Sequence, residues 1–219
     1  MEKDNSYTFR QCTRINLEKW FGLRSTWSSP TLDSWLETEL ALSEQEKSVL
    51  KLFQKGLIIG HDAWNEQELS MNFIGPVFSI ANFMEPYQFN FFAGRKIGTT
   101  IPGVNDDIEL NGEPDGIIAT GYWEPEIPMF AFSEHKRTLD PTGDPAGQAL
   151  AAMLVGQVLN QNKDPIYGCY VVGYDWRFLV LEDKQYMISR NYSSLTDEIF
   201  DILRILKALK QIILAQISK

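Results

Sequence analysis

Hydrophobic residues recur at helical spacing in the first third of the chain and again near its end. Residues 32–60 predict two short helices, and Ser43 with Glu46 three residues later forms the capping-box pattern that opens the second. Residues 64–83 predict a third helix, kinked at Gly75 and Pro76. Residues 195–219 predict a terminal helix with lysines toward its end.

Extended segments fill the middle of the chain. Residues 89–101 have strand composition, residues 104–121 predict a strand, a tight turn at Asn111 and Gly112 and another strand, and residues 128–137 predict a further strand. Asp144 is then a natural N-cap and Pro145 suits the first position of a helix of small and aliphatic residues, a type that packs closely on a sheet. Residues 166–174 and 177–191 return to strand.

This order of elements predicts an α/β or α+β fold, with a mixed central β-sheet flanked by helices. Residues 1–60 are expected to form a helical N-terminal cap or extension, and residues 61–219 the main domain. The length of 219 residues is enough for one such domain and a small extension.

Composition and charge exclude several classes of protein. The net charge of −9 argues against a protein that coats nucleic acid with its whole surface, although a local basic groove remains compatible with it. No apolar run reaches ~18 residues, which predicts no membrane span, and the N-terminus lacks the apolar segment of a secretory signal. Cys12 and Cys169 are too few and too far apart for a disulfide scaffold or a zinc site. These features predict a cytoplasmic protein.

Four polar residues stand out among apolar neighbours in residues 112–154: Asp115, Glu134, Lys136 and Gln148. Alternate side chains of a strand share a face, so Glu134 and Lys136 should point the same way. Phe130 and Phe132 should lie on that face too, and His135 should point the other way.

Asp115 begins the neighbouring predicted strand. If the two strands pair, Asp115 and Glu134 converge at one edge of the sheet. Two carboxylates there can hold a hard cation such as Mg²⁺ or Mn²⁺. A lysine beside the cation can position or deprotonate a water molecule and stabilise charge that develops on a phosphate. The pattern therefore favours metal-assisted hydrolysis of phosphodiester bonds.

Each of these residues also has an ordinary structural interpretation. Asp115 before Gly116 can be a turn residue, and Gln148 can face solvent at a helix start. Glu134 and Lys136 can form an ion pair of little energetic value at a sheet edge.

The D…ExK pattern, with its acid in the sequence PDG, resembles the motif of the PD-(D/E)XK nuclease superfamily, which has the restriction-endonuclease-like fold. The ExK stands at the end of an apolar strand, and a small-residue helix with an early glutamine follows it. The superfamily order of helix, three strands, helix and strand can be followed from residue 64 to about 180. The segments WNEQELSMNFIGP and DPAGQALAAM are also similar to those of a group of uncharacterised bacterial proteins.

The resemblance implies a Mg²⁺- or Mn²⁺-dependent nuclease that hydrolyses DNA, with RNA not excluded as the substrate. It implies that Asp115 is the central metal ligand, that Glu134 is the second, and that the backbone carbonyl of His135 is a third. Lys136 is then the catalytic lysine, and Gln148 orients water, the lysine or a phosphate.

Relatives in this superfamily often carry a glutamate near the start of the first core helix. At ~100° per residue, Glu66 lies over Leu69, Phe73 and Val77, on the face that should meet the sheet. Glu68 points roughly opposite, so Glu66 is the preferred site residue.

A second hypothesis keeps the fold and removes the catalysis. The acidic charge and the lack of an obvious basic face favour a binding or scaffolding subunit in a bacterial defence or repair assembly. The aliphatic terminal helix could serve a homodimer or a protein partner, but core packing explains it equally well.

Overall fold

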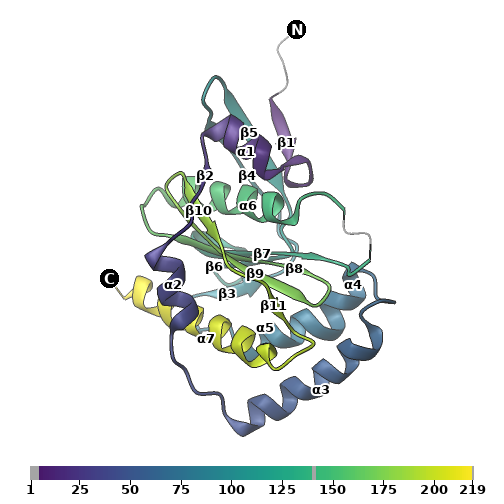
Figure 1. Ribbon diagram of the computed structural model, residues 1–219. Helices are drawn as coiled ribbons and strands as arrows, with labels where there is room; N and C mark the ends of the chain where they lie inside the picture. Colours follow the sequence, from purple (N-terminus) through teal and green to yellow (C-terminus); the bar gives the residue numbers. More distant parts are fainter. Residues whose placement is uncertain (1–4, 140–141, 219) are drawn as a thin grey trace.

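Two β-sheets form the framework of the protein (Figure 1). The computed structural model describes residues 5–139 and 142–218. The smaller sheet has the strand order β1-β5-β4, and the larger sheet has the order β2-β10-β9-β8-β7-β6-β3, with β11 paired to β9. The strands of the smaller sheet are β1 (Ser6–Thr8), β4 (Ile97–Pro102) and β5 (Asp107–Gly112). Those of the larger sheet are β2 (Arg24–Ser25), β3 (Asn90–Phe92), β6 (Gly116–Thr120), β7 (Glu126–Lys136), β8 (Ile166–Val172), β9 (Asp175–Glu182), β10 (Gln185–Ile188) and β11 (Tyr192–Ser193).

The larger sheet is mixed, as the sequence pattern predicts. Strand β7 pairs antiparallel with β6 and parallel with β8, and β8 pairs antiparallel with β9. A parallel pair needs a long crossover connection, and helix α6 (Pro145–Asn160) makes it between β7 and β8. The general class, a mixed sheet flanked by helices, is therefore confirmed.

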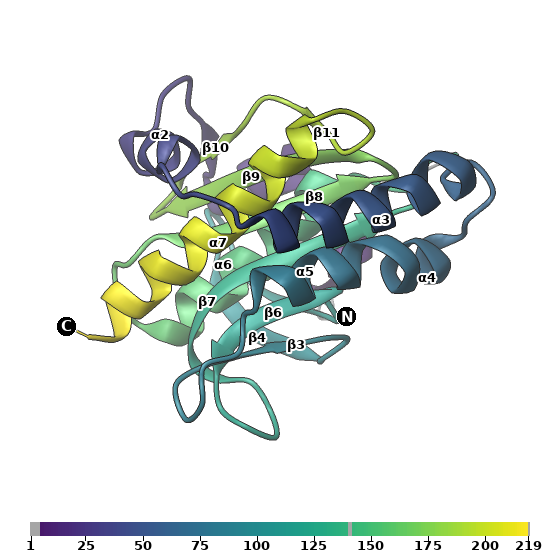
Figure 2. The same cartoon turned by 90° about the horizontal axis from the view of Figure 1, so that it is seen from below.

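Helices cover both faces of the larger sheet. Helices α3 (Glu44–Gly60), α5 (Gly75–Ala81) and α7 (Glu198–Ile217) cross one face (Figure 2), where α2 (Pro30–Glu37) also packs. Helix α6 lies on the other face, beneath the smaller sheet and α1 (Arg14–Phe21) (Figure 1). Each face buries its own hydrophobic core. None of the helices in the described residues is both long enough and apolar enough to cross a membrane.

The capping pattern of the second predicted helix is confirmed. Ser43 Oγ accepts a hydrogen bond from the backbone of Glu46 at 3.2 Å, and Glu46 Oε2 accepts one from the backbone of Ser43 at 2.7 Å. These reciprocal bonds satisfy two of the donors that a helix start leaves free.

The third predicted helix is interrupted near its middle. It consists of α4 (Glu66–Leu69), a π-helical turn η2 (Ser70–Ile74) and α5. The backbone N–H of Gly75 bonds to the carbonyl of Ser70, five residues back, and a Cβ at Gly75 would lie 2.9 Å from that oxygen. The irregularity at Gly75 and Pro76 is thus a π-turn that ends where the proline begins a new helical segment.

The strand composition of residues 89–101 is confirmed, but it is divided between two strands, β3 and β4, which belong to different sheets. One detail of the predicted strands is wrong. Asn111 and Gly112 are not a turn, because they pair within β5 with Gly98 and Ile97. The three residues after Gly112 instead carry the chain from the smaller sheet to the larger one.

The segment predicted as an N-terminal extension packs into both cores. Leu32 and Trp35 lie in the core under α7, whereas Phe9 and Leu17 lie in the core around α6. The segment also contributes the short strands β1 and β2 beside its helices. The division at residue 60 stays a prediction.

Candidate active site

A cleft of about 480 Å³ opens beside the C-terminal end of β7. Its lining includes all five side chains that the sequence analysis proposed for catalysis: Glu66, Asp115, Glu134, Lys136 and Gln148. These residues come from four separate parts of the chain, namely α4, the start of β6, the end of β7 and the first turn of α6.

The pairing of β6 with β7 brings the first acid to the second. Gly116 is opposite Ser133, so β7 continues past the point where β6 begins. Asp115 lies just before β6, and its Oδ2 accepts a hydrogen bond from the backbone N–H of His135 at 2.6 Å. The expectation that these strands pair and that the two acids converge is borne out in this geometry.

Glu134 and Lys136 form a buried ion pair. Lys136 Nζ lies 2.6 Å from Glu134 Oε1, and the two residues are 5% and 6% exposed, Lys136 being the more buried. Glu66 Oε1 lies 3.9 Å from the same ammonium group. Because a charge is costly to bury, this pair differs from the exposed and weak ion pair of the ordinary structural interpretation.

Burial makes Glu134 a weak acid. Loss of hydration, reinforced by the negative charge of Asp115 and opposed by Lys136, raises the pKa of Glu134 to about 7. Near neutral pH its carboxylate is therefore poised between the charged and the protonated form. A buried carboxyl group with a strongly shifted pKa in a cleft is typical of a functional site.

The alternation along β7 holds only for its last part. Glu134 and Lys136 share a face with Phe132, which packs in the core around α6. Phe130 lies in the opposite core, because the register of β7 against β6 shifts between Ile118 and Thr120. The prediction that Phe130 shares the face of the site is thus wrong, and the cause is a bulge in the sheet.

His135 points away from the cleft, as alternation predicts. Its Nδ1 lies 3.1 Å from Ser70 Oγ in the π-turn, and burial lowers the pKa of the ring, which favours the neutral form. The backbone of His135, and not its side chain, contacts a residue of the cleft. Its N–H bonds to Asp115, and in an extended strand the carbonyl of a residue points to the same side as its N–H.

The start of α6 is fixed by the N-terminal segment. Asp144 occupies the N-cap position, but its Oδ2 accepts hydrogen bonds from the backbone and Nε of Arg14, at 2.9 and 3.1 Å, instead of capping the helix. A Cβ at Gly147 would lie 2.7 Å from Thr13 Cα, so this close contact requires glycine. Gln148, 3% exposed, is thereby held at the wall of the cleft.

The N-terminal segment adds side chains that the sequence analysis missed. Thr8 and Arg10 line the cleft, with Arg10 in the 3-10 turn η1 (Phe9–Gln11) that follows β1. Lys96 lines it from the loop just before β4, and Asn111 lines it from β5. No local motif identifies Thr8, Arg10 or Asn111, because parallel pairing of β1 with β5 brings Thr8 opposite Asn111 across about a hundred residues of sequence. Lys96, by contrast, belongs to an Arg-Lys pair that the sequence already marks as able to contact a DNA backbone.

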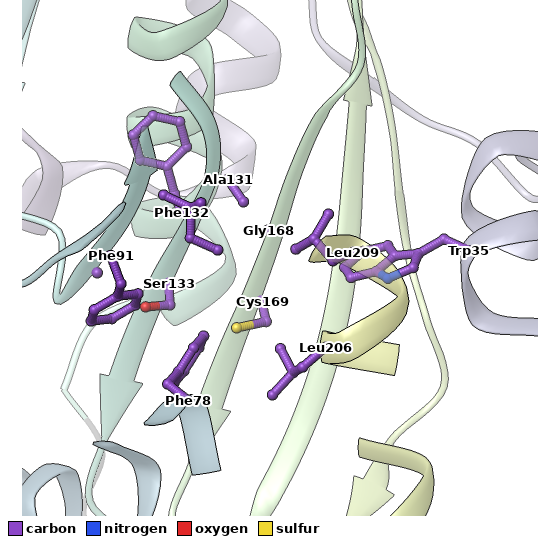
Figure 3. Close-up of a pocket in the computed structure, with 12 residues that line it drawn as sticks. Trp35, Phe78, Phe91, Ala131, Phe132, Ser133, Gly168, Cys169, Leu206 and Leu209 are labelled. Carbon is purple, nitrogen blue, oxygen red and sulfur yellow. The ribbon is translucent and has the colours of Figure 1, made fainter. Parts of the chain in front are cut away.

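Another cavity lies on the opposite side of β7 and has a different character (Figure 3). It measures about 10 Å³, and its walls are mostly apolar side chains such as Phe78, Phe91 and Leu206. This space has room for one water molecule at most. Ser133 Oγ is buried there without a hydrogen-bond partner in the described residues. The cavity is a packing void of the core and not a substrate site.

The acids of the cleft suit a magnesium ion held in part by its substrate. Across residues 5–139 and 142–218, no group of three or more histidine, cysteine, aspartate or glutamate side chains is placed to hold a metal ion. Mg²⁺ usually binds through one or two carboxylates, with water and substrate phosphates completing its octahedron. Asp115 and Glu134, with the carbonyl of His135, provide this kind of donor set.

No protein-family model matches the chain, and no curated protein sequence matches it either. The resemblance to PD-(D/E)XK nucleases therefore rests on the sequence motif and the residues around it in the sequence.

Proposed function

We propose that the protein is a metal-dependent nuclease of the PD-(D/E)XK superfamily that hydrolyses phosphodiester bonds in DNA. The observation that carries the proposal is the convergence of Asp115, Glu134 and Lys136 in one cleft, with Glu66 and Gln148 beside them. The ordinary interpretations, as a turn residue, an exposed ion pair and a helix-start residue, do not explain why these side chains share one cavity. They also do not explain why Glu134 and Lys136 are buried there as a pair.

The proposed ligands of Mg²⁺ or Mn²⁺ are Asp115, Glu134 and the carbonyl of His135. When bound, the ion would polarise a phosphate and lower the pKa of a bound water molecule. Glu134 can bind it only as a carboxylate, so binding is favoured above a pH of about 7, where this acid is ionised.

The other side chains of the site would position the water molecule and stabilise negative charge on the phosphate. Lys136 has three N–H donors, and Glu134 uses one of them, so the others can reach a water molecule or a phosphate oxygen. In a buried site such a fixed positive charge acts more strongly than in water. Glu66 lies against Lys136 and keeps its ammonium group in place, and Gln148 offers both a donor and an acceptor to the water or the phosphate.

Replacing Asp115 by asparagine is the direct test of the metal site. We expect the wild type to bind Mn²⁺ or Mg²⁺ in a calorimetric titration and to nick plasmid DNA only when the metal is present. Asp115→Asn should weaken metal binding by more than about 100-fold, because it removes a charged ligand, and should abolish nicking.

No metal binding by the folded wild type would contradict the proposal. The protein would then fit the second hypothesis, a binding or scaffolding subunit without catalysis. An RNA substrate of the same sequence, assayed beside DNA, decides which nucleic acid is cut.

Two neighbouring glutamates provide a matched pair for testing Glu66. Glu66→Gln should lower the cleavage rate by about 10- to 100-fold, because it removes the charge that lies 3.9 Å from Lys136. Glu68 is exposed, and its Oε2 accepts a hydrogen bond from the backbone of Asn65 at 2.9 Å. Glu68→Gln preserves that capping bond, since glutamine also serves a capping box. Equal rates in the two variants would remove Glu66 from the site.

A further inference from the structure

A second groove continues from the cleft along the outer face of the smaller sheet. It has a volume of about 360 Å³ and is lined by β4 and β5, including Thr99, Thr100 and Glu109. Lys96 and Asn111 line both this groove and the cleft. The two cavities are therefore neighbours that share a wall, and a chain-like ligand in the cleft can pass into the groove beside Lys96.

The chemistry of the groove suits the backbone of a nucleic acid. Its lining includes two threonines and Asn111, whose hydroxyl and amide groups can donate hydrogen bonds to phosphate and sugar oxygens. Lys96 is exposed at the junction, and Arg10 is exposed on the wall of the cleft. Of the residues described, Glu109 is the one acidic residue in the lining of the groove, and its negative charge repels phosphate groups. The groove has no aromatic side chain in its lining, so it would follow the backbone without stacking bases.

The depth of the cleft favours a single strand. Glu134, Lys136 and Gln148 are all at most 6% exposed, so the reacting groups lie at its floor. The N-terminal segment bounds the cleft with Phe9 and Arg10, and the smaller sheet bounds it with Asn111. A flexible strand can enter such a cleft and leave along β4. Four residues of β4, Ile97 to Thr100, line the groove and extend for about 13 Å at ~3.3 Å per residue, which is enough for about two nucleotides.

We propose that the groove along β4 and β5 binds the single-stranded DNA that leaves the cleft, with Lys96 contacting the phosphate next to the one that is cut. This inference rests on the proposed function and adds the substrate form and the path that it takes. Thr100, which is paired with Glu109 on the outer face of the smaller sheet, contacts the following nucleotide, and Glu109 limits the affinity.

The test measures binding of a fluorescein-labelled DNA single strand of about 15 nucleotides, with Ca²⁺ as the cation, by fluorescence anisotropy. Lys96→Ala should weaken binding about fivefold at low salt and lower the slope of log K against log salt by about 0.7, the value for one lost phosphate contact on a single strand. Glu109→Gln should tighten binding, because it removes a like charge from the path.

The matched control is Lys163→Ala. Lys163 is exposed in the loop before β8. It lies at the end of the strands that is opposite the cleft, because β8 starts beside Ala131 and ends beside Lys136. This variant loses the same charge and should leave both affinity and salt slope unchanged. A folding defect weakens binding in any variant, whereas it does not tighten binding in Glu109→Gln.

Cleavage of the same strand with Mg²⁺ separates the groove from the proposed function. If the wild type is active and Lys96→Ala binds and cleaves DNA as the wild type does, the proposal that the groove binds the strand is wrong, and the proposed nuclease function is unaffected. If binding depends on Lys96 but the wild type does not cleave the strand, the groove is a DNA-binding site and the proposed nuclease function is wrong. Tighter binding of the matching duplex, with the same dependence on Lys96, would overturn the preference for a single strand.

Discussion

Replacing Lys136 by methionine is expected to lower metal-dependent DNA cleavage by about 100- to 1,000-fold, the range measured when a single charge-stabilising donor is removed. Methionine has a similar length and keeps the packing of the side chain, but it provides neither a positive charge nor an N–H donor. The rate of plasmid nicking, measured with saturating Mg²⁺ or Mn²⁺, checks the expectation.

Two controls distinguish catalysis from folding in this experiment. Lys163→Met carries the same substitution at an exposed position far along the sheet and should cut at the rate of the parent. The double variant Glu134→Leu and Lys136→Met replaces both members of the buried pair by apolar side chains and leaves no unpaired charge inside the protein. Such replacements are often neutral or stabilising. If Lys136→Met is folded and cuts as fast as the parent, Lys136 is not the catalytic lysine.

Replacing Glu134 by glutamine is expected to stabilise the metal-free protein at alkaline pH while it abolishes cleavage. The pKa of Glu134 is about 7 in the folded protein, against an ordinary value of 4.5 for a glutamate in water. The folded state therefore binds more protons than the unfolded state between these values, and the free energy of unfolding falls as the pH rises through this window. The cost is about 3 kcal/mol at about pH 8, and glutamine avoids it because it stays neutral.

Denaturant unfolding of both proteins in EDTA, from about pH 3.5 to 8, measures this difference. The two stabilities should agree at the acid end, where Glu134 is protonated in both states, and diverge as the pH rises. Adding Mg²⁺ at the alkaline end should stabilise the parent and leave Glu134→Gln unchanged, because binding to the folded state stabilises it. Parallel curves without divergence would show that Glu134 titrates normally.

As a carboxylate, Glu134 lowers the stability of the folded protein, so its presence is better explained by function than by stability. Glu134 is buried beside Asp115, a like charge, and its partner Lys136 offsets only part of the cost. Sites that bind cations or carry out catalysis accumulate such unfavourable charges, and their removal commonly stabilises the protein at the expense of activity. The expected gain of stability in Glu134→Gln thus follows from the same arrangement that supports the proposed function.

The sequence by itself determined the features that depend on near neighbours. The capping box at Ser43 and the opposed directions of His135 and Lys136 follow from backbone geometry over three or four residues. The choice of Glu66 over Glu68 rests on helical periodicity in the same way, and only Glu66 lines the cleft. The pattern of acids and lysine was enough to select the residues that the fold brings together.

Only the tertiary structure decided how distant segments meet. Residues 89–101 have strand composition throughout, but their two halves enter different sheets, and this places Lys96 at the junction of the cleft and the groove. Thr8 pairs with Asn111, and Arg10 follows into the wall of the cleft. Strand pairing over such separations depends on which surfaces bury each other best in the whole molecule, and a local pattern of hydrophobic and polar residues does not encode that choice.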